Sequence, residues 1–206
     1  TGAFGMAESS AGRAMTPDSV FRIASMTKAI TSVALMQLVE RRKIALDDPV
    51  AKYLKAFERP SVLASFDATA GSYVVKPAVS PITVRQLLTH TSGLGYPFTS
   101  ATVRDFKPRN GETFDVGPLM FEPGTQWLYG TSTDWVGRLV ETISEQTLAE
   151  YFLDHITGPL GMPDTAFNLP EAAQPRLVNN WQRDATGALT ERPRQAPSVV
   201  TQFNGG

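Results

Sequence analysis

A stretch in the third quarter of the chain repeats its hydrophobic positions with the period of an α-helix. Four apolar residues stand at i, i+3, i+4 and i+7, so they form one stripe along a helix. They are Val136, Leu139, Val140 and Ile143. A hydroxyl of Ser132 or Thr133 can cap the start of this helix. A further helix is predicted from Thr147 to Ile156, where Gly158-Pro159 ends it.

Another helix is predicted from Ser25 to about Arg41, and its middle is apolar on most sides. Its apolar residues are Ile30, Val33, Ala34, Leu35, Met36, Leu38 and Val39. The charged run Glu40-Arg41-Arg42-Lys43 closes the helix and is typical of a solvated helix end. Because a helix that is apolar on most sides belongs in the interior, we expect this one at the centre of a domain.

Two shorter helices are indicated by their capping residues. Asp47-Asp48-Pro49 combines an N-cap residue with a proline at the first helical position, and predicts a short helix through Tyr53 and Leu54. Thr83 is expected to cap a second helix, from Val84 to Thr89.

The remaining stretches lack a helical pattern. Glycines punctuate residues 1–24, which predicts the end of a hairpin, and residues 57–80 are expected to be irregular. Residues 95–126 are rich in glycine and proline, and after Pro170 polar turn residues prevail. A connection as long as 95–126 is typical of a binding-site wall.

Composition and charge narrow the function classes. The 206 residues are 42% hydrophobic and carry a net charge of -1 with interspersed signs, which favours a globular domain and no nucleic-acid partner. The absence of cysteine excludes disulfides and thiolate sites, and two histidines are too few for a histidine-based zinc site. The longest apolar run, Ala29–Val39, falls short of the roughly 20 residues that cross a bilayer.

Ser25 and Lys28 carry the candidate chemistry. Their i, i+3 spacing places a hydroxyl and an amine on one face at the start of the central helix. A lysine in an apolar site can take the proton of a serine, and the helix N-terminus stabilises developing negative charge. Composition alone predicts roughly 0.4 such pairs by chance, so from the spacing both a catalytic pair and a chance pair are open.

Other polar candidates have structural interpretations. Gly130-Thr131-Ser132-Thr133-Asp134 departs from a nucleophile elbow at its fifth residue, so Ser132 is interpreted as a cap. His90 follows a helix, where a hydrogen bond to nearby backbone is favoured over a catalytic base, and His155 suits a helix end at the surface. Several aromatic residues can line an acyl pocket, although core packing is favoured for Trp135. They are Phe98, Phe106, Phe114, Trp127 and Trp135.

Five sequence blocks, in order, give the chain a family resemblance. They are Phe21-Arg22-Ile23-Ala24-Ser25-Met26-Thr27-Lys28, Leu46-Asp47-Asp48-Pro49-Val50, Leu87-Leu88-Thr89-His90-Thr91-Ser92-Gly93-Leu94, Pro123-Gly124 before Tyr129, and Gly158-Pro159-Leu160-Gly161-Met162. The chain thereby resembles the serine β-lactamase-related family, which includes class C β-lactamases, D-alanyl-D-alanine carboxypeptidases, family VIII carboxylesterases and acyltransferases. The resemblance implies an α and β fold in which a mostly helical subdomain packs against a small antiparallel sheet.

The resemblance also implies roles for individual residues. Ser25 would be the nucleophile and Lys28 its partner, while Tyr129 would shuttle the proton. Thr131 stands where lactam-binding members carry an asparagine that grips the substrate amide, which favours the esterase branch. Thr131 and Trp127 are therefore expected to contact substrate.

The sheet is expected to be incomplete. The family's third motif, a KTG-like, HxG or WGG segment, is missing before Gly206, and the family's first helix and strand are missing before Thr1. We therefore expect residues 1–206 to form a single β-lactamase-related catalytic domain truncated at both ends.

The sequence thus predicts a serine hydrolase that forms an acyl-enzyme on Ser25, a carboxylesterase acting on small-molecule esters or amides. A β-lactamase or D-alanyl-D-alanine carboxypeptidase, and a non-catalytic acyl-binding homologue, are the alternatives. No cofactor, metal, nucleic acid or membrane span is expected. The oligomeric state is left open, as are cytoplasmic and periplasmic or secreted locations.

Overall fold

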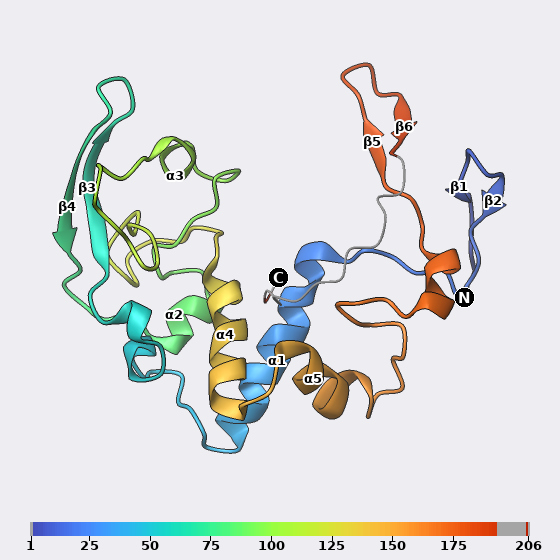
Figure 1. Ribbon diagram of the computed structural model, residues 1–206, viewed down its shortest axis with the longest axis horizontal. Coiled ribbons are helices and arrows are strands. Elements are labelled where there is room, and N and C mark those ends of the chain that lie inside the picture. The colour runs from blue at the N-terminus through green and yellow to red at the C-terminus, as the bar shows by residue number, and fades with distance from the viewer. Residues whose placement is uncertain (1, 193–204, 206) are drawn as a thin grey trace.

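The computed structural model describes residues 2–192 and 205, and helix α1 (Thr27–Glu40) occupies its centre. The 3₁₀ turn η1 (Ala24–Met26) leads into α1, which confirms the helix predicted for this segment. Helix α4 (Ser132–Ser144) packs against α1, and α5 (Leu148–Phe152) contacts both (Figure 1). These three helices hold the middle of the molecule together.

Apolar side chains between the helices form the core. The α4 stripe is largely buried, as its periodicity predicts, and it packs with Ala34, Leu35 and Leu38 of α1. The opposite side of α1 differs from expectation, because Val33 and Met36 are 48% and 43% exposed. Within the described part of the chain, the other segments therefore cover only one side of α1, although this helix is apolar on most sides.

Threonine side chains cap two of the helices, and the cap at Thr83 was predicted. Thr83 Oγ1 accepts a hydrogen bond from the Gln86 backbone N–H at the start of α2 (Val84–Leu88), and Gln86 Oε1 accepts one from the Thr83 backbone N–H. Thr147 and Glu150 form the same reciprocal box at the start of α5. Such a capping box provides hydrogen-bond acceptors for two backbone N–H groups that have no partner within the first helical turn. The chain continues from α5 into the π-helical turn η4 (Leu153–Thr157).

The start of α4 corrects a prediction. Neither Ser132 nor Thr133 is the capping residue, because the N-cap is Thr131 and its side chain makes no capping hydrogen bond. Ser132 is fully buried instead, and its Oγ lies 2.8 Å from Ser92 Oγ. The hydroxyl therefore ties α4 to the segment after α2.

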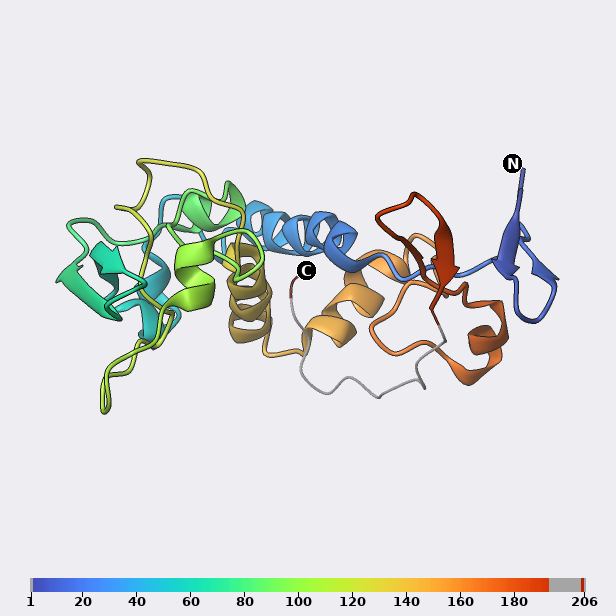
Figure 2. The same ribbon diagram turned by 90° about the horizontal axis from the view of Figure 1, so that it is seen from above.

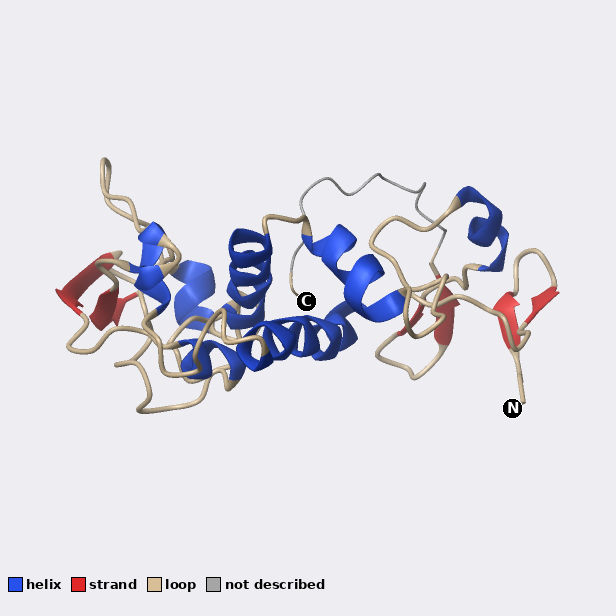
Figure 3. Ribbon diagram, turned by 90° about the horizontal axis from the view of Figure 1, so that it is seen from below, coloured by secondary structure: helices blue, strands red, loops and turns tan. Residues whose placement is uncertain are grey.

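Strands form three separate antiparallel hairpins in the described part of the chain. They are β1 (Met6–Glu8) with β2 (Arg13–Ala14), β3 (Ser61–Asp67) with β4 (Ser72–Pro77), and β5 (Trp181–Arg183) with β6 (Leu189–Glu191). The hairpins lie toward the two ends of the molecule and the helices between them (Figure 3). The predicted α and β class and the N-terminal hairpin are confirmed.

The β3–β4 hairpin shows that the prediction of irregular structure for 57–80 was wrong. Few of its side chains are buried, Val62 and Tyr73 among them, so its sequence lacks the alternation that marks a strand with one dry face. Its turn is stabilised by Asp67 Oδ1, which accepts hydrogen bonds from the backbone N–H groups of Thr69 and Ala70. Val62 pairs with Leu119, which attaches the hairpin to the long loop.

The other elements are short turns. They are η2 (Val50–Lys52), η3 (Lys55–Phe57), α3 (Ala101–Asp105) and η5 (Glu171–Arg176). Residues 95–126 contain only α3 and are otherwise loop, as predicted. Figure 2 shows α1 running between the β3–β4 side of the molecule and the β1–β2 side. No helix in residues 2–192 is both long and apolar enough to cross a membrane.

Asp48 differs from its predicted role as an N-cap. The N-cap of η2 is Pro49, without a side-chain hydrogen bond. Asp48 Oδ2 instead accepts hydrogen bonds from the Tyr53 hydroxyl at 2.5 Å, the Ala45 N–H at 3.0 Å and Lys52 Nζ at 3.1 Å. These bonds, that of Tyr53 foremost, lower the pKa of Asp48 from 3.8 to about 2. The carboxylate therefore joins the segment after α1 to the turn that follows it.

Asp48→Asn is expected to lower the free energy of unfolding at pH 7. A carboxyl whose pKa is depressed in the folded state stabilises it above the unfolded pKa, and this contribution is lost as the pH falls from 3.8 toward 2. The difference in the free energy of unfolding between wild type and variant should therefore disappear over that pH range, as measured by urea titrations at successive pH values. Asp47→Asn is the matched control: its side chain is 74% exposed in an ion pair with Arg85, so a smaller effect is expected. An equal effect of both variants would contradict this account.

Candidate active site

Ser25 lies in η1 and Lys28 at the beginning of α1. Ala24, directly before Ser25, has a φ of 43°, a left-handed conformation that costs a non-glycine residue roughly 1–2 kcal/mol. Strain of this kind is often found beside functional groups. Lys28 lies one turn later, and its Nζ donates a hydrogen bond to Ser25 Oγ at 3.3 Å. Ser25 is exposed and Lys28 half-buried, so the start of α1 is more open than expected.

Tyr129 reaches the same place from the other side of the fold. It precedes α4, and its ring centroid lies 5.0 Å from Lys28 Nζ. A hydrogen bond with Ser25, and then one with Lys28, hold the pKa of the Tyr129 phenol below its ordinary value. The structure thus brings the three residues proposed from sequence together, with Lys28 between the Ser25 hydroxyl and the Tyr129 ring.

A close backbone approach places Tyr129 next to this pair. A Cβ atom at the following residue, Gly130, would lie only 2.1 Å from the Leu94 carbonyl oxygen. Real Cβ atoms do not tolerate such a distance, so only glycine lets the two segments meet. Gly130 therefore lets the chain turn from Tyr129 into α4 while it touches the segment after α2.

Tyr96 belongs to the site as well and was missed by the sequence analysis. Its ring centroid lies 5.6 Å from Lys28 Nζ, so the ammonium group of Lys28 lies near two aromatic rings. Cations are attracted to the faces of such rings. The Tyr96 hydroxyl donates to Asp134 Oδ2 at 2.7 Å, and burial first, then this bond, raise the pKa of Tyr96. No spacing within the sequence connects Tyr96 to Lys28; its place directly after Gly93-Leu94-Gly95 was the available signal.

The five aromatic residues expected to line an acyl pocket separate into three places. Phe98 stacks on Tyr96 with ring centroids 4.8 Å apart, and Trp127 is 66% exposed with its ring 6.3 Å from His90. Phe106 and Phe114 contact each other instead, where Phe106 packs on Tyr73. Trp135 packs edge-on against Phe57 in the core, as favoured for it. The common pocket is therefore not observed, and Phe98 and Trp127 alone flank the site.

Thr131 lies at the N-cap of α4, two residues after Tyr129, and is half-buried. It is therefore close along the chain to Tyr129. His90 also contacts this segment, since its Nδ1 accepts a hydrogen bond from the Gly130 N–H at 3.4 Å. The imidazole therefore bonds to backbone as expected, although to a segment distant in sequence.

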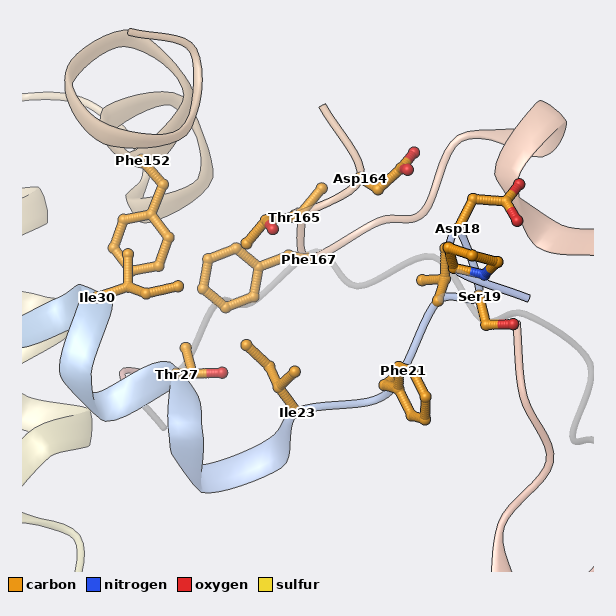
Figure 4. A pocket seen from close by; sticks show the side chains of 13 residues that line it. Asp18, Ser19, Phe21, Ile23, Thr27, Ile30, Phe152, Asp164, Thr165 and Phe167 are labelled. Carbon is orange, nitrogen blue, oxygen red and sulfur yellow. The ribbon is translucent and has the colours of Figure 1, made fainter. Parts of the chain in front are cut away.

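An apolar cavity of about 320 Å³ opens beside the same helix on its other side (Figure 4). Ile23, Thr27 and Ile30 face it from the α1 segment, opposite Phe152 and Phe167. Residues 27 and 30 lie on the helix face away from residues 25 and 28, because successive residues turn by about 100°. The cavity is therefore separate from the Ser25 hydroxyl. Among residues 2–192 and 205, no three histidine, aspartate or glutamate side chains gather as a metal site would require.

Comparison with known proteins gives this arrangement a family. A sequence model of the Beta-lactamase family matches residues 1–200. The chain belongs to the Beta-lactamase family. The resemblance inferred from the five sequence blocks is thereby confirmed, and with it the β-lactamase and penicillin-binding-protein type of fold.

Several members of the Beta-lactamase family are similar over much of the chain. An acyltransferase, CalJ of Penicillium decumbens, is 42% identical over 74% of this chain and 39% of its own length. A lovastatin esterase of Penicillium rubens is 36% identical over 73% of this chain and 40% of its own. The structure of a mutant simvastatin synthase, LovD of Aspergillus terreus, superposes with a TM-score of 0.82 at 31% identity, over 92% of this chain and 49% of that one.

Acyl transfer is the chemistry that the relatives of this chain support, which is broader than the carboxylesterase predicted from sequence. The chain also spans less than half the length of the three relatives named.

The phenol of Tyr129 is expected to titrate below its ordinary pKa of 10.0, and Ser25→Ala to raise that pKa by removing the foremost hydrogen bond. Carbon-13 NMR of ring-labelled tyrosine can follow the titration in the two proteins. Tyr73 is the internal control: burial first, and then its hydrogen bond with Glu112, raise its pKa, and Ser25→Ala should leave it unchanged. Titration of Tyr129 at or above 10.0 in the wild type would contradict the geometry of the site.

Proposed function

We propose that this protein is a serine acyl-transfer enzyme that forms an ester intermediate on Ser25. The observation that carries the proposal is the contact of Lys28 Nζ with Ser25 Oγ at 3.3 Å, with the centroid of the Tyr129 ring 5.0 Å from the same nitrogen. A serine hydroxyl is a weak nucleophile until a neighbouring base takes its proton. A phenol with a lowered pKa, beside an ammonium group, can supply that base.

In the first half of the reaction, Ser25 Oγ attacks the carbonyl carbon of an ester. Its proton passes to the Tyr129 phenolate, while the Lys28 ammonium stabilises the negative charge on both oxygens. The tetrahedral intermediate collapses, the bond to the leaving alkoxide breaks, and Tyr129 returns the proton to that alkoxide. The Ser25 backbone N–H is one proposed donor to the developing oxyanion.

In the second half, an acceptor hydroxyl takes the acyl group from Ser25. The acceptor gives its proton to Tyr129 and attacks the Ser25 ester, and the serine oxygen recovers a proton as it leaves. Relatives named acyltransferase and lovastatin esterase support both an alcohol and water as acceptor. The exposed aromatic rings of Phe98 and Trp127 beside the site suit small apolar esters. We propose residues 1–206 as part of one catalytic domain, so each test below uses the complete protein that contains this chain.

Ser25→Ala is expected to abolish labelling by a fluorophosphonate and turnover of p-nitrophenyl butyrate. Mass spectrometry of the labelled protein locates the adduct, and added butanol should divert part of the acyl group into butyl butyrate. Ser132→Ala is the matched control, because Ser132 is buried and hydrogen-bonded to Ser92, and it should keep its labelling. An adduct on Ser132, or an acyl-Ser25 that persists without turnover, would overturn the proposal, the latter in favour of a non-catalytic acyl-binding protein.

Esters are expected to be preferred over β-lactams, because Thr131 has a single hydroxyl where lactam-binding members carry an asparagine, whose separate carbonyl oxygen and NH2 group can pair with both polar groups of a substrate amide. An amide left without that partner costs about 1–3 kcal/mol, or roughly 5- to 150-fold in discrimination. The comparison is kcat/KM for p-nitrophenyl butyrate and nitrocefin, with Thr131→Asn alongside and Thr131→Val as its control. A preference of the wild type for nitrocefin would favour a β-lactamase or carboxypeptidase instead. An asparagine variant with no gain on nitrocefin would remove Thr131 as the cause.

A further inference from the structure

His90 holds the chain on both sides of Tyr129. Its carbonyl oxygen accepts a hydrogen bond from the Leu128 N–H at 2.9 Å, and its Nδ1 accepts one from the Gly130 N–H at 3.4 Å. Its ring also packs against the Tyr129 ring, with centroids 4.9 Å apart and planes tilted by 42°. One residue therefore contacts the residues before and after Tyr129 as well as its side chain.

The backbone conformation of His90 serves this contact. Its φ of 55° lies in the left-handed region, which few non-glycine residues adopt and in which histidine, asparagine and aspartate are enriched. The residue follows α2, whose last turn bonds to it through the His90 N–H and the Leu87 carbonyl at 3.3 Å. Such a conformation persists only where the surroundings enforce it. Here it directs both the carbonyl and the ring of His90 toward residues 128–130.

The hydrogen bonds of the ring require a neutral imidazole. Nδ1 can accept from Gly130 only without a proton, which leaves the proton on Nε2, 3.4 Å from Thr133 Oγ1. Burial, and then the charge of Lys28, lower the pKa of His90 and favour this neutral form. A protonated ring would lose the bond to Gly130 and add a second positive charge beside Lys28.

We propose that His90 is a positioning residue that fixes the Tyr129 phenol against Ser25 and Lys28 by binding the backbone on either side of it. This inference rests on the proposed function, since it assigns a role only if Tyr129 handles the proton. His90 does not touch the reacting atoms; it acts through Tyr129. A displacement of a catalytic group by about 1 Å can cost on the order of 100-fold in rate, so a positioning contact has a measurable effect.

Two substitutions at position 90 separate positioning from backbone strain. His90→Gly accepts the left-handed conformation without strain but removes the ring and its acceptor. His90→Asn also tolerates this conformation, and its carbonyl oxygen can take the place of Nδ1. In the complete protein with p-nitrophenyl butyrate, we expect His90→Gly to lower kcat by about 10- to 100-fold with KM nearly unchanged, and His90→Asn to recover most of kcat. His155→Gln, at the other histidine, is the control and should leave kcat unchanged.

The outcomes keep this inference distinct from the proposed function. If Tyr129→Phe lowers kcat but His90→Gly does not, His90 has no positioning role while the proposed function stands. If Tyr129→Phe leaves kcat unchanged, the proposed role of Tyr129 is wrong, and the positioning role of His90, which rests on it, is wrong as well. Because His90 acts through the phenol, Tyr129→Phe combined with His90→Gly should be little slower than Tyr129→Phe alone. Multiplying effects in the double variant, or equal losses in His90→Gly and His90→Asn, would overturn the inference.

Discussion

The packing of α1 against α4 is the contact on which the rest of this structure depends. Apolar side chains from both helices meet in the core, with Leu35 and Leu139 fully buried between them. Ser25 and Lys28 lie at the start of α1, and Tyr129 lies just before α4. The buried helix contact therefore sets the relative position of two chain segments that carry opposite halves of the site. Interiors packed to crystalline density hold such a geometry because their side chains have little space in which to shift.

The site places the positive charge of Lys28 beside the hydroxyl group of one serine and the aromatic rings of two tyrosines. Lys28 lies within 5.0 Å of the Tyr129 ring centroid and 5.6 Å of the Tyr96 ring centroid, and it bonds to Ser25. The two tyrosines then differ through their partners. Tyr129, beside Ser25 and Lys28, has a lowered pKa, whereas burial and Asp134 raise the pKa of Tyr96. Two chemically identical side chains thus have different proton affinities because their neighbours differ.

Local sequence signals located most of the helices. The apolar stripe predicted α4, and Thr83 and Thr147 marked helix starts because a threonine hydroxyl satisfies backbone donors within three residues of itself. The same reasoning failed at Asp48, whose carboxylate bonds to Tyr53, Ala45 and Lys52 instead of the next turn. It also failed for β3 and β4, since a hairpin that buries few side chains leaves no clear alternation in its sequence.

Residue spacing by itself determined that Ser25 and Lys28 share one helix face, because the helical repeat alone brings residues three apart together. The family blocks then pointed to Tyr129 as their partner. Only the tertiary structure brought Tyr96 to Lys28 and His90 to Gly130, since those contacts join segments through space. It also decided that Phe106, Phe114 and Trp135 pack elsewhere than at the site. A periodic pattern encodes which face of its own helix a residue occupies, whereas its partner across the fold depends on how all the segments pack together.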